Sequence, residues 1–321
     1  MRFSYQFLPD GSYATELKAE EMAQGLVSPG ILWIHFWQLA GEDVEILSQV
    51  FKFHPLAIED CLHRHTHPKI EEYENCLFLV VYGPGFKGYE EDFSPWEHDI
   101  FLGENFLVTV HDQESAVVNQ VRERVERNPA VAVKSPCMLM YHLLDAVIDS
   151  YFPVLERLEQ RLEGIEKQLF EHFSEAALKR IFATKKEVLA IRRLLAIQRE
   201  IFSTLTHREL RYVKAPTQTY LRDVYDHIIR LFDSLEIMRE LLFSALEAYT
   251  SQVSNKMNSI MKTLSIVATI MLPLTLIASI FGMNFTVIPG LESALGFWGT
   301  MGGMGALGAW LVWYFKKKGW W

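Results

Sequence analysis

Two long stretches without a charged residue lie close together near the C-terminal end of the chain. The first runs from residue 264 to 281 and the second from 294 to 315, with a dozen residues between them. A helix needs roughly 20 apolar residues to cross a bilayer, and a stretch of about 18 is long enough to predict a span. We therefore predict two membrane-spanning helices, 264–281 and 294–315, joined by a short external loop at 282–293.

Basic residues beside these stretches predict the orientation of the hairpin. Lys256 and Lys262 precede the first stretch, Lys316, Lys317 and Lys318 follow the second, and the loop between them has no Lys or Arg. Because positively charged flanks stay on the cytoplasmic side, we expect both termini in the cytoplasm. Residues 1–16 contain no apolar segment typical of a signal peptide, so no cleaved leader is expected.

The remainder of the chain is acidic. The first 262 residues hold all but one of the 40 acidic residues and all but three of the 31 basic residues, a formal charge of −11. This charge argues against a nucleic acid as partner, because phosphate binding needs a basic surface. An acidic surface concentrates cations nearby, although the same charge also serves solubility alone. Cys61, Cys76 and Cys137 lack metal-ligand spacing and are typical of a reducing compartment.

Residues 1–145 alternate short apolar runs with helical patterns and predict an α/β domain. The domain contains no GxGxxG, Walker or GxSxG motif, so we expect no enzyme activity. Turn signals such as Gly103-Glu104-Asn105 separate the apolar runs. Strands are predicted at 31–37, 77–82, 99–102 and 106–111, and helices at 43–51, 55–62 and 115–127.

From residue 136 onward the pattern becomes one of long helices, predicted at 137–171, 174–212 and 217–281. Between 224 and 264, apolar residues recur about every 3.6 positions, so the last helix should run nearly straight. No Gly or Pro lies between 217 and 272, and this helix therefore continues into the first apolar stretch. A monomer cannot bury a helix of this length, so symmetric association about its axis is expected. The predicted domains are 1–145, an α/β domain; 146–262, a helical stalk; and 263–321, the membrane hairpin.

On the helix predicted at 217–281, polar residues lie along one face, and this face continues into the apolar stretch 264–281. In a membrane span such residues mark contacts between helices, or they line a pore in which apolar side chains form a throat. Pro273 removes one helical hydrogen bond here and permits flexure. Both interpretations stay open for Thr275 and Ser279. At about 100° per residue, the residues of this face are Asn258, Met261, Leu264, Leu272, Thr275 and Ser279.

Gly282, Met283 and Asn284 follow the first apolar stretch directly. Neither apolar stretch contains an Asp, Glu or His that would strip water from a divalent ion, whereas Asn284 offers a carboxamide oxygen. Mg²⁺ gives up its water reluctantly, so a ring of amide oxygens suits an ion that keeps its hydration shell. Selection would then depend on the size and hydration of the whole ion.

Three histidines alternate with other residues at His63, His65 and His67. On an extended segment this spacing puts three imidazoles on one side, which suits Zn²⁺, Ni²⁺ or Co²⁺. The same pattern is typical of a polar loop leading into Pro68, and both interpretations stay open.

The tripeptide Gly282-Met283-Asn284, its short turn, the second apolar stretch and Lys316–Lys318 form a more specific pattern than the tripeptide alone. Together with segments 54–60, 68–73, 220–227, 254–256 and 270–275, it makes the chain resemble the CorA family of divalent-metal channels. The resemblance implies a cytoplasmic funnel, a homopentamer and passive influx of Mg²⁺, often also of Co²⁺ or Ni²⁺. The overall fold class expected is α+β, with the stalk helix continuing into the two-helix membrane hairpin.

The resemblance also implies roles for individual residues. Gly282, Met283 and Asn284 match the selectivity signature, and Asp223 matches a carboxylate of a regulatory metal site between subunits. Glu91 and Asp92 are candidates for the partner carboxylate in the N-terminal domain. The matches to pore-lining positions are Asn258, Leu264, Leu272 and Thr275, with Met261 at the cytoplasmic constriction.

The turn after the signature departs from many magnesium-type members, because residues 285–292 contain a single acid, Glu292. A turn with so few carboxylates is closer to that of the zinc-transporting branch.

Three hypotheses follow. The first is a Mg²⁺ channel or transporter of the inner membrane, gated by cytoplasmic metal binding. The second is a Zn²⁺ transporter, with or without proton coupling, and the third is a non-conducting, membrane-anchored helical scaffold. We expect no prosthetic group, divalent ions as substrate and regulatory ligand, and the lipid bilayer as partner.

Overall fold

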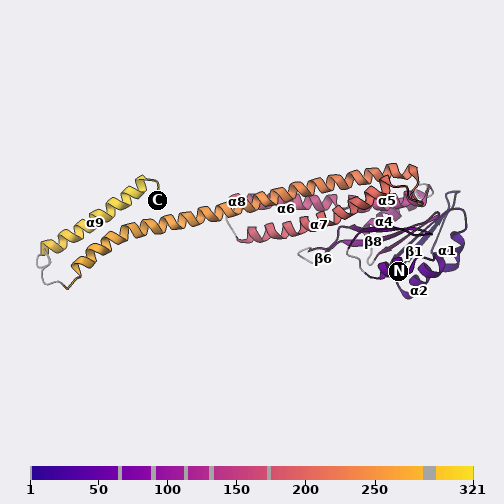
Figure 1. Cartoon of the computed structure of the whole chain (residues 1–321), viewed down its shortest axis with the longest axis horizontal. Coiled ribbons are helices and arrows are strands. Elements are labelled where there is room, and N and C mark those ends of the chain that lie inside the picture. Colours follow the sequence, from indigo (N-terminus) through magenta and orange to yellow (C-terminus); the bar gives the residue numbers. More distant parts are fainter. Residues whose placement is uncertain are drawn as a thin grey trace. The chain divides into compact units, whose positions relative to one another are not determined.

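The chain divides into two compact units, residues 1–245 and 246–321, in a computed structural model. The structure describes residues 2–63, 67–87, 92–111, 115–129, 134–171, 175–284 and 294–320, and at 86, 87, 92, 170, 171 and 294 it describes the backbone alone. Helix α8 (Ala215–Phe281) contributes residues to both units (Figure 1). The predicted domain limits at 145 and 262 stay predictions.

A mixed seven-stranded sheet forms the centre of the first unit, with strand order β2-β1-β3-β9-β8-β5-β4. The β3 and β9 strands pair in parallel, and every other neighbouring pair in this sheet is antiparallel. The short strands β6 (Phe86–Lys87) and β7 (Asp92–Phe93) pair separately. The bounds in the large sheet are β1 (Arg2–Phe7), β2 (Tyr13–Thr15), β3 (Ile31–Trp37), β4 (Lys69–Glu72), β5 (Leu77–Gly83), β8 (Trp96–Leu102) and β9 (Phe106–His111).

Helices cover both faces of this sheet, which explains why its central strands are continuous apolar runs rather than alternating ones. On one face, a Cβ placed on Gly25 of α1 would lie 3.5 Å from Leu32 Cδ1. On the other, a Cβ on Gly83 would lie 3.7 Å from Val147 Cγ1 of α5, which contacts β3, β5, β8 and β9. The helices of this domain are α1 (Ala19–Gly25), α2 (Gly41–Glu45), a π-helical turn (Ile46–Val50), α3 (Pro55–Leu62), α4 (Ala116–Arg127) and α5 (Pro136–Asp149).

The prediction of one helix over 137–171 is wrong, because the chain breaks it after Asp149. Helix α6 (Phe152–Glu171) starts three residues later, with Pro153 in its first turn, where a missing N–H costs nothing. Tyr151 lies in the break, is fully buried, and donates a 2.8 Å hydrogen bond from its hydroxyl to the carbonyl of Tyr82. The apolar periodicity runs on across this break, so the sequence pattern alone does not show it.

Other predicted limits also move. The strand predicted at 99–102 begins at Trp96, and the helix predicted at 174–212 is α7 (Glu175–His207). The long helix begins at Ala215 rather than 217 and ends at Phe281 as predicted. Strand β1 and helix α1 were not predicted. Long side chains tie the helices of this unit together, for example Arg161 on α6 to Glu187 on α7 at 2.7 Å.

The second unit consists of the C-terminal part of α8 and helix α9 (Ala294–Lys317). The two helices pack through small and apolar side chains: a Cβ on Gly308 would lie 3.8 Å from Leu274 Cδ1, and Ile266 is only 4% exposed. Most other apolar residues of the unit are exposed, for example Leu272 at 69%. Among the described helices, α8 alone is long and apolar enough to cross a membrane by length and composition. Helix α9 contains six glycines, and its crossing stays a prediction.

Three buried histidines lie together on the sheet face that α5 covers. The ring centroids of His98 and His111 are 4.1 Å apart, and those of His35 and His111 are 5.0 Å apart. Within the described part of the chain, neither ring nitrogen of His111 has a hydrogen-bond partner. Burial lowers the pKa of His98 to about 4, and burial with repulsion from His98 lowers the pKa of His35 to about 3.

Acid should therefore destabilise the first unit. Folding keeps these imidazoles neutral, whereas in the unfolded chain they take up protons as the pH falls below about 6.5. Their contribution to stability is thus complete above that pH and is lost as the pH falls toward 4, by about 3 kcal/mol for His98 alone. We expect the unfolding temperature of the purified chain, followed by tryptophan fluorescence, to fall between pH 7 and pH 4.5.

The substitution His98→Phe removes one titrating group and should flatten this pH dependence. Exposed His67 provides the matched control, and His67→Gln should leave the slope as it is in the original chain. An unchanged slope in His98→Phe would show that the buried histidines do not govern acid stability.

Candidate functional site

The six residues predicted to line a pore are all exposed on the second unit. At about 100° per residue they fall within a sector of α8 about 120° wide. Ile266 and Leu274, which face α9, lie on the opposite side of the helix. Helix α9 therefore packs behind this face and leaves it uncovered in the described part of the unit. We call this face the polar stripe; its residues are Asn258, Met261, Leu264, Leu272, Thr275 and Ser279.

The hydrogen bonds of the polar stripe keep oxygen atoms available. The hydroxyl of Thr275 donates to the carbonyl of Met271 at 2.8 Å, so its lone pairs remain free to accept a bond from water. Pro273 lies inside the helix, and the carbonyl of Thr269, four residues earlier, receives no N–H from that position. Both features place acceptors in a stretch that is otherwise apolar.

The predicted selectivity residues lie where α8 ends. The N–H of Gly282 donates to the carbonyls of Ala278 at 3.0 Å and Ser279 at 3.2 Å, and that of Met283 to Ile280 at 3.3 Å. A Cβ on Gly282 would lie 3.4 Å from the Ala278 oxygen and 3.5 Å from the Ser279 oxygen, in van der Waals contact with this last turn.

Asn284 is exposed immediately beyond this turn. The C-terminal end of a helix carries a partial negative charge and unpaired carbonyl groups. The carboxamide of Asn284 therefore lies in a setting that attracts a cation. The rest of the predicted external loop, including Glu292, falls outside the described residues.

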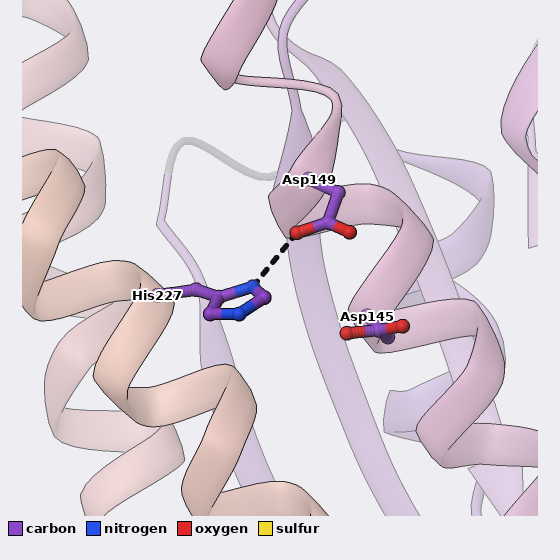
Figure 2. A group of neighbouring side chains, drawn as sticks. All are labelled: Asp145, Asp149 and His227. Atoms are coloured by element: carbon purple, nitrogen blue, oxygen red, sulfur yellow. Dashed lines mark hydrogen bonds and ion pairs between the residues drawn. The ribbon is translucent and has the colours of Figure 1, made fainter.

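A second cluster lies in the first unit and joins α5 to α8 (Figure 2). Asp145 and Asp149 come from α5 and His227 from α8, and one ligand atom of each lies within 4.8 Å of the other two. The imidazole Nδ1 of His227 is 2.7 Å from Asp149 Oδ1. Among the described residues, only here do three such side chains come this close together.

Asp223, the carboxylate predicted from the sequence, lies at the edge of this cluster. Its Oδ2 is 3.8 Å from Nε2 of His227, one helical turn further along α8. Burial raises the pKa of Asp145, and the negative charge of Asp149 raises it further. His227 opposes this, Asp223 adds to it, and Arg124 opposes it to a smaller extent. Three carboxylates and one imidazole thus share a site with surplus negative charge. Oxygen and nitrogen ligands of this kind suit a divalent cation.

Asp145, Asp149 and His227 were not predicted as site residues. A signal was present in the sequence, because Asp145 and Asp149 are four residues apart, as are Asp223 and His227. Residues at this spacing share one face of a helix. The sequence does not show that the two helix faces meet.

The predicted histidine site is only partly described. The ring Nδ1 of His63 is 3.1 Å from the carbonyl of Glu59, at the end of α3, and His67 is exposed. His65 lies outside the described residues, so this site stays a prediction. Of the two candidate partner carboxylates, Glu91 also lies outside them, and Asp92 is described only as backbone in β7.

Comparison with known proteins assigns the chain to a family. The model of the family described as CorA-like Mg²⁺ transporter protein matches residues 28–317. The cobalt/magnesium transport protein CorA of Thermotoga maritima is 33% identical over 290 residues, which cover 90% of this chain and 83% of that protein. The putative metal ion transporter YfjQ of Bacillus subtilis is 33% identical over 288 residues, 90% of this chain and 89% of that protein.

The fold is likewise similar to a solved structure over the whole chain. The CorA magnesium transporter from Methanocaldococcus jannaschii matches with a TM-score of 0.87 and 23% identity, covering 100% of this chain and 99% of that one. This match confirms the predicted class, an N-terminal α/β domain and a long helix that continues into an apolar C-terminal region. Since the family model and the relatives both cover most of its length, the chain belongs to the CorA-like Mg²⁺ transporter family.

Proposed function

We propose that this protein is a homopentameric divalent-cation channel of the cell inner membrane, with both termini in the cytoplasm. Mg²⁺ is its principal substrate, and Co²⁺ and Ni²⁺ also pass. The observation that carries this proposal is the polar stripe of α8, which ends at the exposed carboxamide of Asn284. In the proposed assembly the domains are 1–145, 146–262 and 263–321, with spans at 264–281 and 294–315.

A ring of copies explains why the second unit exposes both the polar stripe of α8 and a large apolar surface. Polar and small groups on a span gain nothing from lipid, so the stripe faces an axis shared by the copies. Because α9 packs on the opposite side of α8, it takes the outer position, against lipid. Met261, Leu264 and Leu272 then form apolar rings along the axis, and such rings can close a pore by excluding water.

Selection takes place at the ring of Asn284 carboxamides. The amide oxygens and the carbonyl-rich ends of the five α8 helices attract a cation without replacing its water. The Thermotoga maritima relative, a cobalt/magnesium transport protein, supports Mg²⁺ and Co²⁺ as substrates.

A Zn²⁺ transporter is the second candidate, favoured by the single acid, Glu292, in the turn 285–292. The histidines at 63, 65 and 67 would suit this ion as well. Flux into liposomes of Mg²⁺, Co²⁺, Ni²⁺ and Zn²⁺, with and without a pH gradient, separates the two candidates. Zn²⁺ uptake that depends on the gradient and exceeds Mg²⁺ uptake would select the second.

Gating is assigned to the cluster of Asp145, Asp149, Asp223 and His227. A divalent ion bound there relieves the repulsion between carboxylates and holds α5 against α8. Binding when cytoplasmic Mg²⁺ is plentiful favours the closed state, and loss of the ion releases α8. In this way uptake limits itself.

Asn284→Ala should lower the initial rate of Mg²⁺ uptake into liposomes roughly ten-fold or more, because the variant lacks the amide oxygen that accepts hydrogen bonds from the hydrated ion. The oligomer, measured by size-exclusion chromatography with light scattering, should be unchanged. Asn255→Ala is the matched control, since Asn255 is an exposed amide on α8 that lies off the polar stripe. Full, selective uptake by Asn284→Ala would favour the scaffold hypothesis or a different filter.

Asp223→Ala, Asp149→Asn and His227→Gln should each shift inhibition by Mg²⁺ on the cytoplasmic side to roughly ten-fold higher concentration, because each removes one ligand or ligand support. The measurement is uptake rate against internal Mg²⁺ in loaded liposomes. Asp233→Asn, an exposed carboxylate on another face of α8, should leave the curve in place. If the three cluster variants give the same curve as the original chain, the cluster does not gate the channel.

A further inference from the structure

The end of α9 carries an unbalanced positive charge. Beyond Glu247 the chain has five lysines and a single acid, Glu292, which belongs to the loop at the opposite end of the predicted hairpin. Lys316, Lys317 and Lys318 are exposed, and no carboxylate in the described part of the second unit lies near to neutralise them. These exposed ammonium groups are therefore available to an anionic ligand.

The chain folds back on itself at this point and brings in a fourth lysine. Gly319 adopts a φ of 67°, and the N–H of Trp320 donates to the carbonyl of Phe315 at 3.0 Å. This turn stacks the Trp320 ring on that of Phe315, with centroids 5.7 Å apart. Lys262 of α8 then donates from Nζ to the carbonyl of Gly319 at 3.2 Å.

Aromatic rings hold two of these ammonium groups in place. Nζ of Lys262 lies 5.9 Å from the ring centroid of Trp320, and Nζ of Lys317 lies 5.0 Å from that of Trp313. Both indole rings are exposed. The ammonium of Lys262 uses one of its three N–H donors on Gly319 and retains two for another acceptor. Helices α8 and α9 thus bring Lys262 and the Trp320 ring together at the end of α9, next to Lys316–Lys318 in the chain.

We propose that this basic site, formed by Lys262 with Lys316–Lys318 beside Trp320, binds the phosphodiester headgroup of an anionic phospholipid. The proposal rests on the membrane hairpin of the proposed function. Basic pockets between membrane helices on the cytoplasmic side bind such headgroups. Exposed tryptophans are typical of the membrane–water interface. The exposed apolar surface of α8 and α9 begins beside the site and offers the acyl chains a place that a free phosphate would not use.

The test measures which lipid stays with the protein. The full-length chain is purified in mild detergent with equal amounts of phosphatidylglycerol and phosphatidylcholine, and the retained lipids are quantified by mass spectrometry. We expect phosphatidylglycerol to be enriched over phosphatidylcholine. Since one juxtamembrane lysine is worth about 1 kcal/mol, Lys262→Gln should reduce this enrichment about five-fold. Lys262→Arg, which keeps the charge, should retain most of it.

Lys256→Gln is the matched control, because Lys256 is an exposed lysine on α8 outside the basic site. An equal loss in Lys256→Gln and Lys262→Gln would overturn the site in favour of diffuse attraction, as would equal retention of the two lipids by the original chain. Displacement of phosphatidylglycerol by millimolar inorganic phosphate would overturn the assignment to a lipid.

The assay needs no ion gradient, so its failure is separate from failure of the proposed channel. A chain that retains phosphatidylglycerol but conducts no ion leaves this site standing. A chain that conducts Mg²⁺ without lipid preference removes the site and leaves the channel.

Discussion

The C-terminal part of α8 imposes the main constraint on this protein, because one chain cannot bury it. The helix is apolar around most of its surface, and α9 covers only the side that carries Ile266 and Leu274. Exposed apolar groups of this extent need lipid or another protein surface. The polar stripe needs something different, since its hydroxyl and amide groups gain nothing from hydrocarbon. Lipid on one side and further copies on the other satisfy both needs at once, which connects the membrane, the oligomer and the pore in the proposed function.

Helix α5 connects the core of the first unit to the candidate metal cluster. Its buried face, with Val147, packs on the sheet beside His98, while Asp145 and Asp149 face His227 of α8. A stiff core behind α5 holds the two carboxylates in position, because packed interiors transmit displacement rather than absorb it. The position of His227 relative to α5 is thus sensitive to whatever occupies the space between them. The buried histidines add a condition, since the arrangement of α5 on the sheet depends on their remaining neutral.

The long helices could be predicted from the sequence, because their apolar residues recur with helical periodicity. The tertiary contacts between helices and strands could not. The end of α8 at Phe281 and the uncharged stretch at 294–315 follow from composition, which the sequence shows directly. The break at Tyr151 depends on a hydrogen bond to Tyr82, a residue far away in the chain, and periodicity carries no such information. For the same reason Asp223 could be singled out by resemblance, whereas its neighbours Asp149 and Asp145 could not. They come from another helix, and only tertiary packing brings them to His227.

A single helix carries both candidate sites, and this gives the proposed gating a physical route. Asp223 and His227 lie near the start of α8, and Gly282 to Asn284 follow its last residue, Phe281. Between them Pro273 is the one proline inside the helix, so the hydrogen-bond pattern of α8 is weakest close to Leu272, a predicted ring of the throat. In the proposed gating, a change in how α8 is held at its first turns would pass along the helix and be absorbed near Pro273, where a helical hydrogen bond is missing. In the proposed channel, Pro273 lies beside the apolar ring of Leu272, where a small change in radius would decide whether water enters. In the proposed function, metal binding and conduction would therefore be coupled through this one helix, as regulation between distant sites requires a shared element that both sites affect.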